Sequence, residues 1–333
     1  MCGAQSVFMR GGAELLHENL VEALRRAGHE AELVHIPTDW SRPNLMASAF
    51  AWRLLTIPAD VVIATNFPSY FVRHRRKVVW LTHQHRAAYD ALSQPWSDFG
   101  DDDVALEQHR EVVEWDSRVL SEARRLFTIS QRVAERLRHY NGLDAEVLYH
   151  PPPLWDELHG AVSGQYVFCA TRLEANKRPD LMIEAMAHVR SHTRMVIAGN
   201  GSMHERLDQR IRELGLQSRV SLLGFVDDAR VVDLFAKARG VVYVPHDEDY
   251  GYVTLQAFYA RKPVVTTDDS GGVLEWVRDG VTGFVAAPNP AALGQAIDRL
   301  AASPQQGAEL GEAGSRSVAD LDWAQVVDTL LSA

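Results

Sequence analysis

The chain has 333 residues, of which 46% are hydrophobic and 23% charged. That length and composition predict about two globular domains and exclude a disordered or fibrous protein. Lysine and arginine number 34 against 44 aspartate and glutamate, and the resulting net charge of −10 argues against nucleic acid as a partner.

The first half of the chain alternates helical and strand patterns. Leu16, Leu20 and Leu24 fall on one face of a helix predicted at 13–27, and Gly28 is a natural C-cap. Continuous apolar runs at 60–65 and 77–81 are typical of parallel strands covered on both faces. The other predicted elements are strands at 31–36, 126–129 and 146–149, and helices at 44–55, from about 104 to 123, and at 131–140. This alternation predicts a doubly wound α/β sheet.

Three prolines at 151–153 and a polar stretch to Gly164 mark the predicted domain boundary. Strands are then predicted at 166–171, 194–198, 220–223, 240–244 and 263–267, and helices at 179–189, 204–214, 231–238 and 253–260. We therefore predict two tandem Rossmann-like domains, residues 1–155 and 165–318, facing each other across a cleft, and a terminal segment at 319–333.

Targeting signals are not evident, so we expect a cytoplasmic protein. Residues 1–20 contain no apolar core of signal-peptide length. The most apolar long stretch, residues 45–67, carries Arg53 and Asp60, which argues against a membrane span. The two cysteines, Cys2 and Cys169, lie far apart in the sequence, as is typical of a reducing compartment.

Ligands of doubly wound folds bind beyond the carboxyl ends of the strands, so the loops there hold the candidate residues of the first domain. Gly11 and Gly12 lead into a helix whose free amides could approach an anion, and a simple turn is the alternative. His83 follows a predicted strand and could hydrogen-bond a polar substrate, with His85 as a rival and a packed histidine as the alternative. A metal site on this pair lacks a third ligand at a suitable spacing, so we expect no metal.

In the second domain, Arg172 and Lys177 share one strand-to-helix loop. They can converge on one diphosphate, the arginine as a fork and the lysine as a point charge, although a solvated basic loop is the alternative. A phosphate-binding loop of the Gly-x4-Gly-Lys-Ser/Thr type is missing from the sequence. Gly199 and Gly201 form half of a dinucleotide fingerprint and by themselves indicate a tight turn.

Residues 246–258 combine acidic side chains, a glycine and a helix start directly after a predicted strand. Glu248 and Asp249 could accept hydrogen bonds from sugar hydroxyls, and the amides at 252–254 could hold phosphate. The alternative is that these acidic residues complement the helix dipole.

Taken in order, these segments resemble glycosyltransferase family 4, retaining enzymes of the GT-B fold. The matching segments are 11–14, Ser130 with the helix after it, Arg172 with Lys177, 199–201, 223–225, 248–251, 261–264, 271–272 and 280–283. The resemblance covers nearly the whole chain and is strongest from residue 166 to 288.

The resemblance implies a role for each matching residue. Arg172 and Lys177 would stabilise the leaving nucleoside diphosphate, and Glu248 would hold the hydroxyls of the donor sugar. The glycine loop would close on the diphosphate, His83 would lie at the sugar end of the cleft, and the last helix, residues 321–331, would cross back onto the first domain. The other implied donor contacts are Gly11, Gly12, Gly199, Phe225, Val226, Tyr250, Gly251, Tyr252, Val253 and Gln256.

Two departures from the family pattern stand out. Position 256, where the family's second glutamate binds the ribose hydroxyls, carries Gln256. An amide can accept one of those hydrogen bonds but loses the assistance of charge, which costs on the order of 1 kcal/mol. Only ten residues precede Gly11, fewer than the family's first strand and its lead-in usually occupy. Either the central strand of the first sheet lacks its beginning, which would weaken that sheet, or the true start of the protein lies upstream.

The sequence therefore predicts a metal-independent retaining glycosyltransferase that needs no cofactor. It would transfer a sugar from a nucleoside diphosphate sugar, UDP- or GDP-linked, to a hydroxyl of a small molecule, glycan or lipid-linked acceptor. The alternatives are a nucleotide-sugar epimerase of similar fold and a catalytically weakened sugar-nucleotide binder. The basic run 73–77 suggests weak membrane-surface contact, with a solvated loop as the alternative, and residues 93–103 are expected among the acceptor loops. The sequence specifies neither the acceptor nor the oligomeric state.

Overall fold

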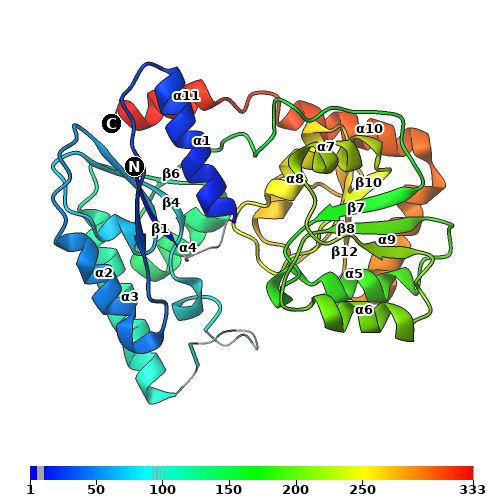
Figure 1. Ribbon diagram of the computed structural model, residues 1–333, viewed down its shortest axis with the longest axis horizontal. Coiled ribbons are helices and arrows are strands. Elements are labelled where there is room, and N and C mark those ends of the chain that lie inside the picture. The colour runs from blue at the N-terminus through cyan, green and yellow to red at the C-terminus, as the bar shows by residue number, and fades with distance from the viewer. Residues whose placement is uncertain (6–10, 93, 95–96, 98, 101, 333) are drawn as a thin grey trace. The chain divides into compact units, whose positions relative to one another are not determined.

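The computed structural model describes residues 1–5, 11–92, 94, 97, 99–100 and 102–332. The chain divides into unit 1, Met1–His150 with Asp322–Ala333, and unit 2, Pro151–Leu321 (Figure 1). Each unit holds a six-stranded parallel sheet with helices packed against it. The division falls at the three prolines, so residues 156–164, between the two predicted domains, belong to unit 2.

Unit 1 has the strand order β2-β1-β3-β4-β5-β6. Its strands are β1 (Cys2–Gln5), β2 (Val34–Pro37), β3 (Val62–Asn66), β4 (Lys77–His83), β5 (Arg125–Thr128) and β6 (Glu146–Val147). Its helices are α1 (Gly12–Arg26), α2 (Leu45–Arg53), α3 (Asp103–Ser121), α4 (Gln131–Asn141) and α11 (Trp323–Leu331), with short 3-10 turns η1 (Arg42–Asn44), η2 (Ser69–Phe71) and η3 (Arg86–Ala88). In Figure 1, α1 and α11 lie on one face of this sheet and α2 and α3 on the other.

Over the described residues β1 spans four positions, and a side chain extends its pairing with β3. All four residues of β1 pair with β2, but only Cys2 pairs with β3, opposite Ala64. Beyond that point the Asn66 side chain takes the place of a strand backbone: its Oδ1 accepts from the Ala4 amide at 3.0 Å, and its Nδ2 donates to the Ala4 carbonyl at 3.4 Å. Both backbone groups of Ala4 are thereby satisfied on the β3 side.

A buried histidine fixes the beginning of unit 1. A Cβ at Gly3 would lie 2.2 Å from Cε1 of His17, so this close approach requires glycine. His17 Nε2 lies 2.7 Å from Oγ1 of Thr65, and its Nδ1 lies 3.1 Å from Nε2 of His35. Burial lowers the pKa of His17 to about 3, so the ring is neutral at pH 7 and connects α1 with β2 and β3.

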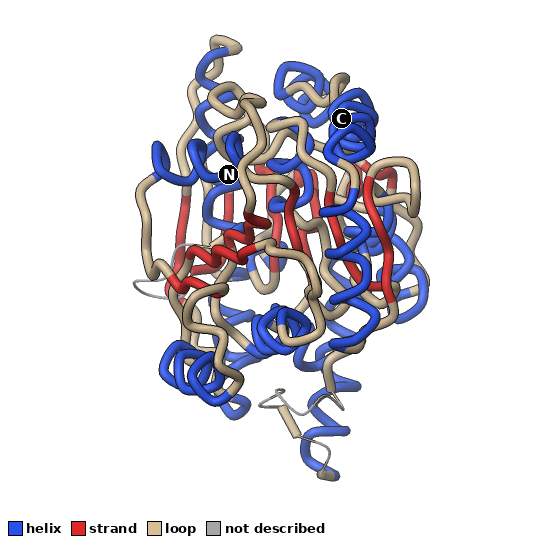
Figure 2. Tube along the Cα trace, turned by 90° about the vertical axis from the view of Figure 1, so that its right-hand side faces the viewer, coloured by secondary structure: helices blue, strands red, loops and turns tan. Residues whose placement is uncertain are grey.

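Unit 2 has the strand order β12-β11-β10-β7-β8-β9. Its strands are β7 (Tyr166–Ala170), β8 (Arg194–Ala198), β9 (Val220–Leu222), β10 (Gly240–Val242), β11 (Val264–Thr267) and β12 (Gly283–Ala286). Its helices are α5 (Pro179–Met186), α6 (His204–Glu213), α7 (Asp228–Lys237), α8 (Tyr252–Tyr259), α9 (Pro290–Ala302) and α10 (Pro304–Ser317), with 3-10 turns η4 (Ala175–Lys177) and η5 (Gly272–Glu275). Figure 1 places α5 and α6 on one face and α7 and α8 on the other, and Figure 2 shows strands side by side between helices.

Two helices of unit 2 differ from their predicted bounds because side chains cap them. Helix α7 begins at Asp228, three residues before the predicted start, since Asp227 accepts a hydrogen bond from the Arg230 amide at 2.8 Å. Helix α5 ends at Met186 rather than residue 189, where the Arg219 guanidinium binds the carbonyls that follow, including that of Val189 at 3.0 Å. The sequence patterns also missed β12, α9 and α10.

The C-terminal helix packs within unit 1. Trp323, the first residue of α11, lies with its ring 6.2 Å from that of Trp80 in β4 and 5.5 Å from that of His150. Figure 1 shows α11, in red, beside α1, in blue. Over the described ranges, no helix has the length and apolar character that a membrane crossing requires.

One carboxyl group is buried in the core of unit 1. Asp116 on α3 accepts a hydrogen bond from Oη of Tyr89 at 2.7 Å, and Nδ2 of Asn141 donates to that phenol oxygen at 3.2 Å. Burial raises the pKa of Asp116 to about 7, an effect that the hydrogen bond from Tyr89 opposes. The folded protein therefore favours the protonated acid.

The stability of the protein should depend on the protonation of Asp116. Because its pKa is higher in the folded than in the unfolded state, its contribution is complete below about pH 4 and is lost as the pH rises through about 7. We predict that Asp116→Asn raises the unfolding temperature at pH 8 relative to wild type but not at pH 4. Calorimetry at both values tests this, with the exposed Asp320→Asn as the control. An Asp116→Asn protein with the same pH dependence as wild type would contradict the prediction.

Candidate functional site

The candidate residues of unit 2 follow several strands of one parallel sheet. The loops after β7, β8, β10 and β11 all lie at the carboxyl edge of this sheet. The chain runs outward from β7 to β8 and β9 and then returns to the other side of β7 with β10. Ligand sites of doubly wound folds form where the strand order reverses in this way.

An ion pair connects the loops after β7 and β10. Nζ of Lys177 donates to Oε2 of Glu248, and Oη of Tyr243 donates to the same oxygen at 2.6 Å. Burial alone would raise the pKa of Glu248, but the charge of Lys177 and the two hydrogen bonds hold it below its ordinary value. Lys177 and Glu248, 14% and 16% exposed, are therefore a charged pair at the sheet edge.

Arg172 lies at the beginning of the same loop and remains exposed. Its guanidinium forms no hydrogen bond or ion pair with any residue that the structure describes. Burial raises the pKa of the Tyr243 phenol well above its ordinary value, and the charge of Arg172 partly opposes that effect. A guanidinium with no partner among the described residues thus lies near the Lys177–Glu248 pair.

The sequence analysis missed a second arginine, Arg178, which connects three of the loops. Its guanidinium donates to both carboxylate oxygens of Asp269 at 2.7 Å. It also donates to the carbonyls of Val244 and Pro245 at 2.8 and 2.9 Å and to Oγ1 of Thr267 at 2.9 Å. Arg178 therefore joins the loop that carries Lys177 to the loops after β10 and β11.

Glycines let these loops approach one another closely. Gly199 has φ +137°, and a Cβ there would lie 1.9 Å from the carbonyl oxygen of Thr171, beside Arg172. Gly271 has φ +62°, and a Cβ there would lie 2.6 Å from the carbonyl oxygen of Glu248. Glycine at these two positions lets the loop after β8 approach the loop after β7, and the loop after β11 approach the loop after β10.

The first turn of α8 faces this edge. Gly251 precedes the helix in a left-handed conformation, with φ 81° and ψ 60°. Oγ1 of Thr254 is buried and has no hydrogen-bond partner among the described residues. Tyr250 and Val253 are buried, and the Tyr250 ring lies 5.6 Å from that of Tyr252. The helix start therefore offers a hydroxyl and backbone amides, the groups that bind phosphate in other proteins.

Gln256 makes a contact that glutamate could not. Its Nε2 donates to the carbonyl oxygen of Pro153 at 3.2 Å, and the residue is 9% exposed. A carboxylate at this position would face that carbonyl without a proton to donate. The amide therefore has a structural partner in the proline run.

The other predicted contacts lie further from the ion pair or in unit 1. After β9, Phe225 is 79% exposed and Val226 is half-buried. In unit 1, Gly11 caps α1 and its amide donates to Oε2 of Glu14 at 2.8 Å, and Gly12 is the first residue of the helix. Part of the glycine loop, residues 6–10, lies outside the described residues, as does part of the predicted acceptor loop, residues 93–103.

His83 and its rival His85 have different surroundings. His83 ends β4, is half-buried, and its Nδ1 lies 2.8 Å from the carbonyl oxygen of Gln84. His85 stacks on the indole of Trp40, with ring centres 5.5 Å apart. No group of three histidine, cysteine, aspartate or glutamate side chains is placed to hold a metal ion within the described part of the chain.

Comparison with known protein families finds a match in unit 2. Residues 159–317 match the family model of the glycosyl transferases group 1. The matched residues all lie within unit 2. Human alpha-1,3/1,6-mannosyltransferase ALG2 is 26% identical over 210 residues, which cover 55% of this chain and 50% of that protein. The chain thus spans about half the length of this curated relative.

Solved structures show the fold of the whole chain. Sucrose-phosphate synthase from Thermosynechococcus elongatus superposes with a TM-score of 0.79 at 17% identity, covering 97% of this chain and 92% of that one. The Anabaena protein Alr3699/HepE in complex with UDP and glucose superposes with a TM-score of 0.74 at 18% identity, covering 100% and 99%. The prediction of an α/β protein with two Rossmann-like domains of the GT-B type is therefore confirmed.

The network around Arg178 should contribute measurably to stability. We predict that Arg178→Lys lowers the free energy of unfolding by about 1–3 kcal/mol, because a lysine keeps the charge but cannot bind Asp269 in a bidentate manner or reach the other acceptors. Urea denaturation measures the change. The control is Arg172→Lys, which removes no hydrogen bond to a described residue and should alter stability by less than about 0.5 kcal/mol. Equal effects of the two variants would contradict this account of the loops.

Proposed function

We propose that this protein is a retaining glycosyltransferase that transfers a sugar from a nucleoside diphosphate sugar, UDP- or GDP-linked, to a hydroxyl acceptor. The observation that carries the proposal is the Lys177–Glu248 pair at the strand reversal of a glycosyl transferases group 1 domain. It joins the cation that the family resemblance assigns to the diphosphate and the carboxylate that it assigns to the donor sugar.

The proposed chemistry follows from the charge that develops on the leaving group. The bond between the anomeric carbon and the diphosphate oxygen breaks, and that oxygen keeps the electron pair. Arg172, Lys177 and the first turn of α8 are the groups that would stabilise the new charge. The acceptor oxygen bonds to the anomeric carbon on the same face, and its proton passes to the leaving phosphate.

Binding would change the partners of the ion pair. A diphosphate that contacts Lys177 replaces part of its interaction with Glu248, so the carboxylate becomes able to accept hydrogen bonds from the sugar. Tyr243 continues to hold the carboxylate through its phenol. The remaining proposed donor contacts are Gly11, Gly12, His83, Gly199, Phe225, Val226, Tyr250, Gly251, Tyr252, Val253 and Gln256.

Two comparisons support the donor class. The Anabaena protein was solved with UDP and glucose, and human ALG2 is named as a mannosyltransferase. The bound UDP supports a uridine diphosphate sugar as the donor, and a guanosine diphosphate sugar is the alternative that we propose. The cations of the site could supply the positive charge that a metal ion supplies in other enzymes, so we also propose that the reaction needs neither metal nor cofactor. Activity in excess EDTA would test the independence from metal. We further propose that the reaction takes place in the cytoplasm.

A catalytically weakened sugar-nucleotide binder is the second candidate, because the Gln256 amide is engaged with Pro153 where the family has a charged ribose ligand. Binding of a nucleoside diphosphate sugar without turnover on any acceptor would favour this candidate. Release of a rearranged sugar without an acceptor would instead indicate an epimerase.

The test of the proposed function is mutational. We predict that Lys177→Ala lowers the rate of transfer by about 100-fold or more, because a cation that stabilises the leaving diphosphate is lost. Release of UDP or GDP from a panel of nucleoside diphosphate sugars, with and without acceptor alcohols, measures turnover. The control is Lys237→Ala, an exposed lysine of α7 that pairs with Asp233, and both variants are first shown to be folded by circular dichroism. Near-normal turnover by Lys177→Ala would remove this residue from the site.

A further inference from the structure

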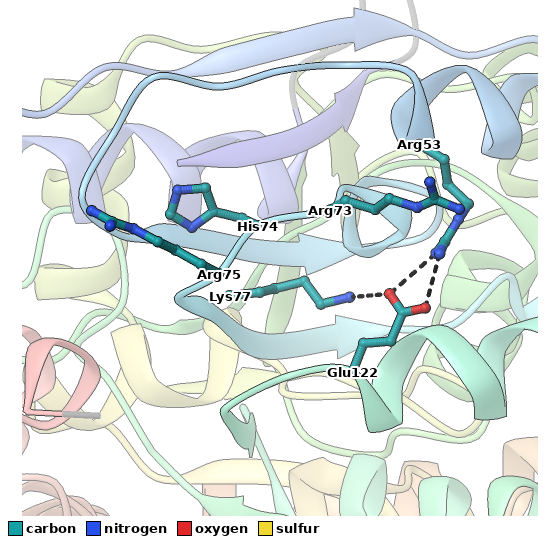
Figure 3. A pocket seen from close by; sticks show the side chains of 6 residues that line it. All are labelled: Arg53, Arg73, His74, Arg75, Lys77 and Glu122. Carbon is teal, nitrogen blue, oxygen red and sulfur yellow. Dashed lines mark hydrogen bonds and ion pairs between the residues drawn. The ribbon is translucent and has the colours of Figure 1, made fainter.

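A basic cavity lies in unit 1 at the edge of the sheet where β4 begins. Its volume is about 560 Å³. Its lining residues come from the end of α2, the segment before β4, the first residue of β4 and the residue that follows α3. They are Arg53, Arg73, His74, Arg75, Lys77 and Glu122 (Figure 3). His83, at the other end of β4, lies at the opposite edge of the sheet, so this cavity is separate from the sites predicted there.

Two of the cations have structural partners. Lys77 is almost fully buried, and its Nζ donates to the carbonyls of Tyr70 and Val119 at 3.1 and 2.7 Å. Arg53 donates to both carboxylate oxygens of Glu122, at 2.9 and 3.2 Å. Lys77 thus satisfies one carbonyl of η2 and one near the end of α3, and Arg53 neutralises the carboxylate that follows α3, so both cations have a structural role.

The cavity nevertheless has an excess of positive charge. Four of its six lining residues are lysine or arginine, and Glu122 is the one carboxylate among them. Burial alone would raise the pKa of Glu122, but the hydrogen bond from Arg53 and the charge of Lys77 hold it below its ordinary value. Even with Glu122 ionised, the lining residues carry three more positive than negative side chains, in a chain whose net charge is −10.

Arg73 and Arg75 carry most of this excess. Arg73 is exposed and forms no hydrogen bond or ion pair with any residue in the described ranges. Figure 3 shows its side chain extending toward Arg53, another cation, and Arg75 extending the other way. Nη2 of Arg75 lies 4.0 Å from Oδ1 of Asp60. Both side chains are highly exposed, so this ion pair restrains the Arg75 guanidinium only weakly.

The backbone that presents these arginines is fixed. Nδ1 of His74 accepts a hydrogen bond from the Arg76 amide at 3.1 Å, and its Nε2 donates to the carbonyl of Ala59 at 2.9 Å. The carbonyl of Arg76 also accepts from the Val62 amide at 3.1 Å, at the beginning of β3. A loop held in this way loses little further freedom when a ligand binds.

From this geometry we infer that the basic cavity binds a phosphate group of a ligand other than the donor sugar nucleotide. The guanidinium of Arg73 offers the planar fork that binds phosphate in a bidentate manner, and Arg53 and Lys77 add positive charge beside it. Arg75, which extends the other way, adds to the positive field of the cavity. The phosphate belongs either to a soluble phosphorylated compound or to the headgroup of an anionic lipid, and the chemistry at the arginines is the same for both.

The first experiment uses inorganic pyrophosphate as the soluble probe. Its binding is measured by titration calorimetry at low salt in the Lys177→Ala background, which removes the lysine of the proposed donor site. We expect the double variant Arg73→Gln with Arg75→Gln to weaken binding by about tenfold or more. The control, Arg110→Gln with Arg206→Gln, changes the net charge equally at two exposed arginines outside the cavity and should bind like its parent.

The second experiment uses vesicles of phosphatidylcholine with and without phosphatidic acid, in a flotation assay of the same proteins. Binding to the anionic vesicles alone, lost in the Arg73/Arg75 variant and kept in the control, identifies a lipid headgroup. Pyrophosphate binding that is lost in the Arg73/Arg75 variant, without vesicle binding, identifies a soluble ligand. The inference is overturned if neither probe binds, or if the control loses as much binding as the cavity variant. Because the calorimetry already carries Lys177→Ala, failure here leaves the proposed transferase activity untouched.

Discussion

The guanidinium of Arg178 holds three loops of unit 2 at one edge of the sheet, and the candidate site depends on that arrangement. Its five contacts reach the end of β11, the residues after β10 and the carboxylate of Asp269. Arg178 directly follows Lys177 in the chain, so its position also determines where the lysine lies. The pairing of Lys177 with Glu248, 71 residues further along the chain, is the consequence. The proposed chemistry needs Lys177 and Glu248 close together. They meet because β10 pairs with β7 on the side opposite β8, so the loops after β7 and β10 are neighbours.

The central strands of the two sheets could be predicted from the sequence because a continuous run of apolar residues indicates a strand that is buried on both faces. The central strands of both units appeared as continuous hydrophobic segments, and the loops that follow them contained Arg172, Lys177 and Glu248. The ends of elements were predicted less well, since α5 and α7 end or begin where a side chain caps them. Strand β12 and the two helices after it were missed, although residues 283–286 pair in register along the whole of β11.

The residues that organise the site could not be predicted in the same way. Arg178 looked like one more basic residue before a proline, and its acceptors lie 66 to 91 residues away in the sequence. Tyr243 resembled another apolar residue of the strand predicted at 240–244, and only the fold brings its phenol to Glu248. The Gln256 substitution was visible, but its contact with Pro153 was not. The basic run before β4 was also visible, yet only the structure shows that Lys77 is buried while Arg73 is left exposed.

Nucleotide binding by the wild-type protein tests the central claim most directly. Unfolding temperature is measured with UDP, GDP, ADP, CMP and dTDP, each alone, for the wild type and for Glu248→Gln with Lys177→Ala. A nucleotide at about 100 times its dissociation constant adds about 2.7 kcal/mol to the stability of the folded state. The account predicts a clear rise with one nucleoside diphosphate that is lost in the double variant. No rise with any nucleotide, or an equal rise in both proteins, would contradict a nucleotide site at the Lys177–Glu248 pair.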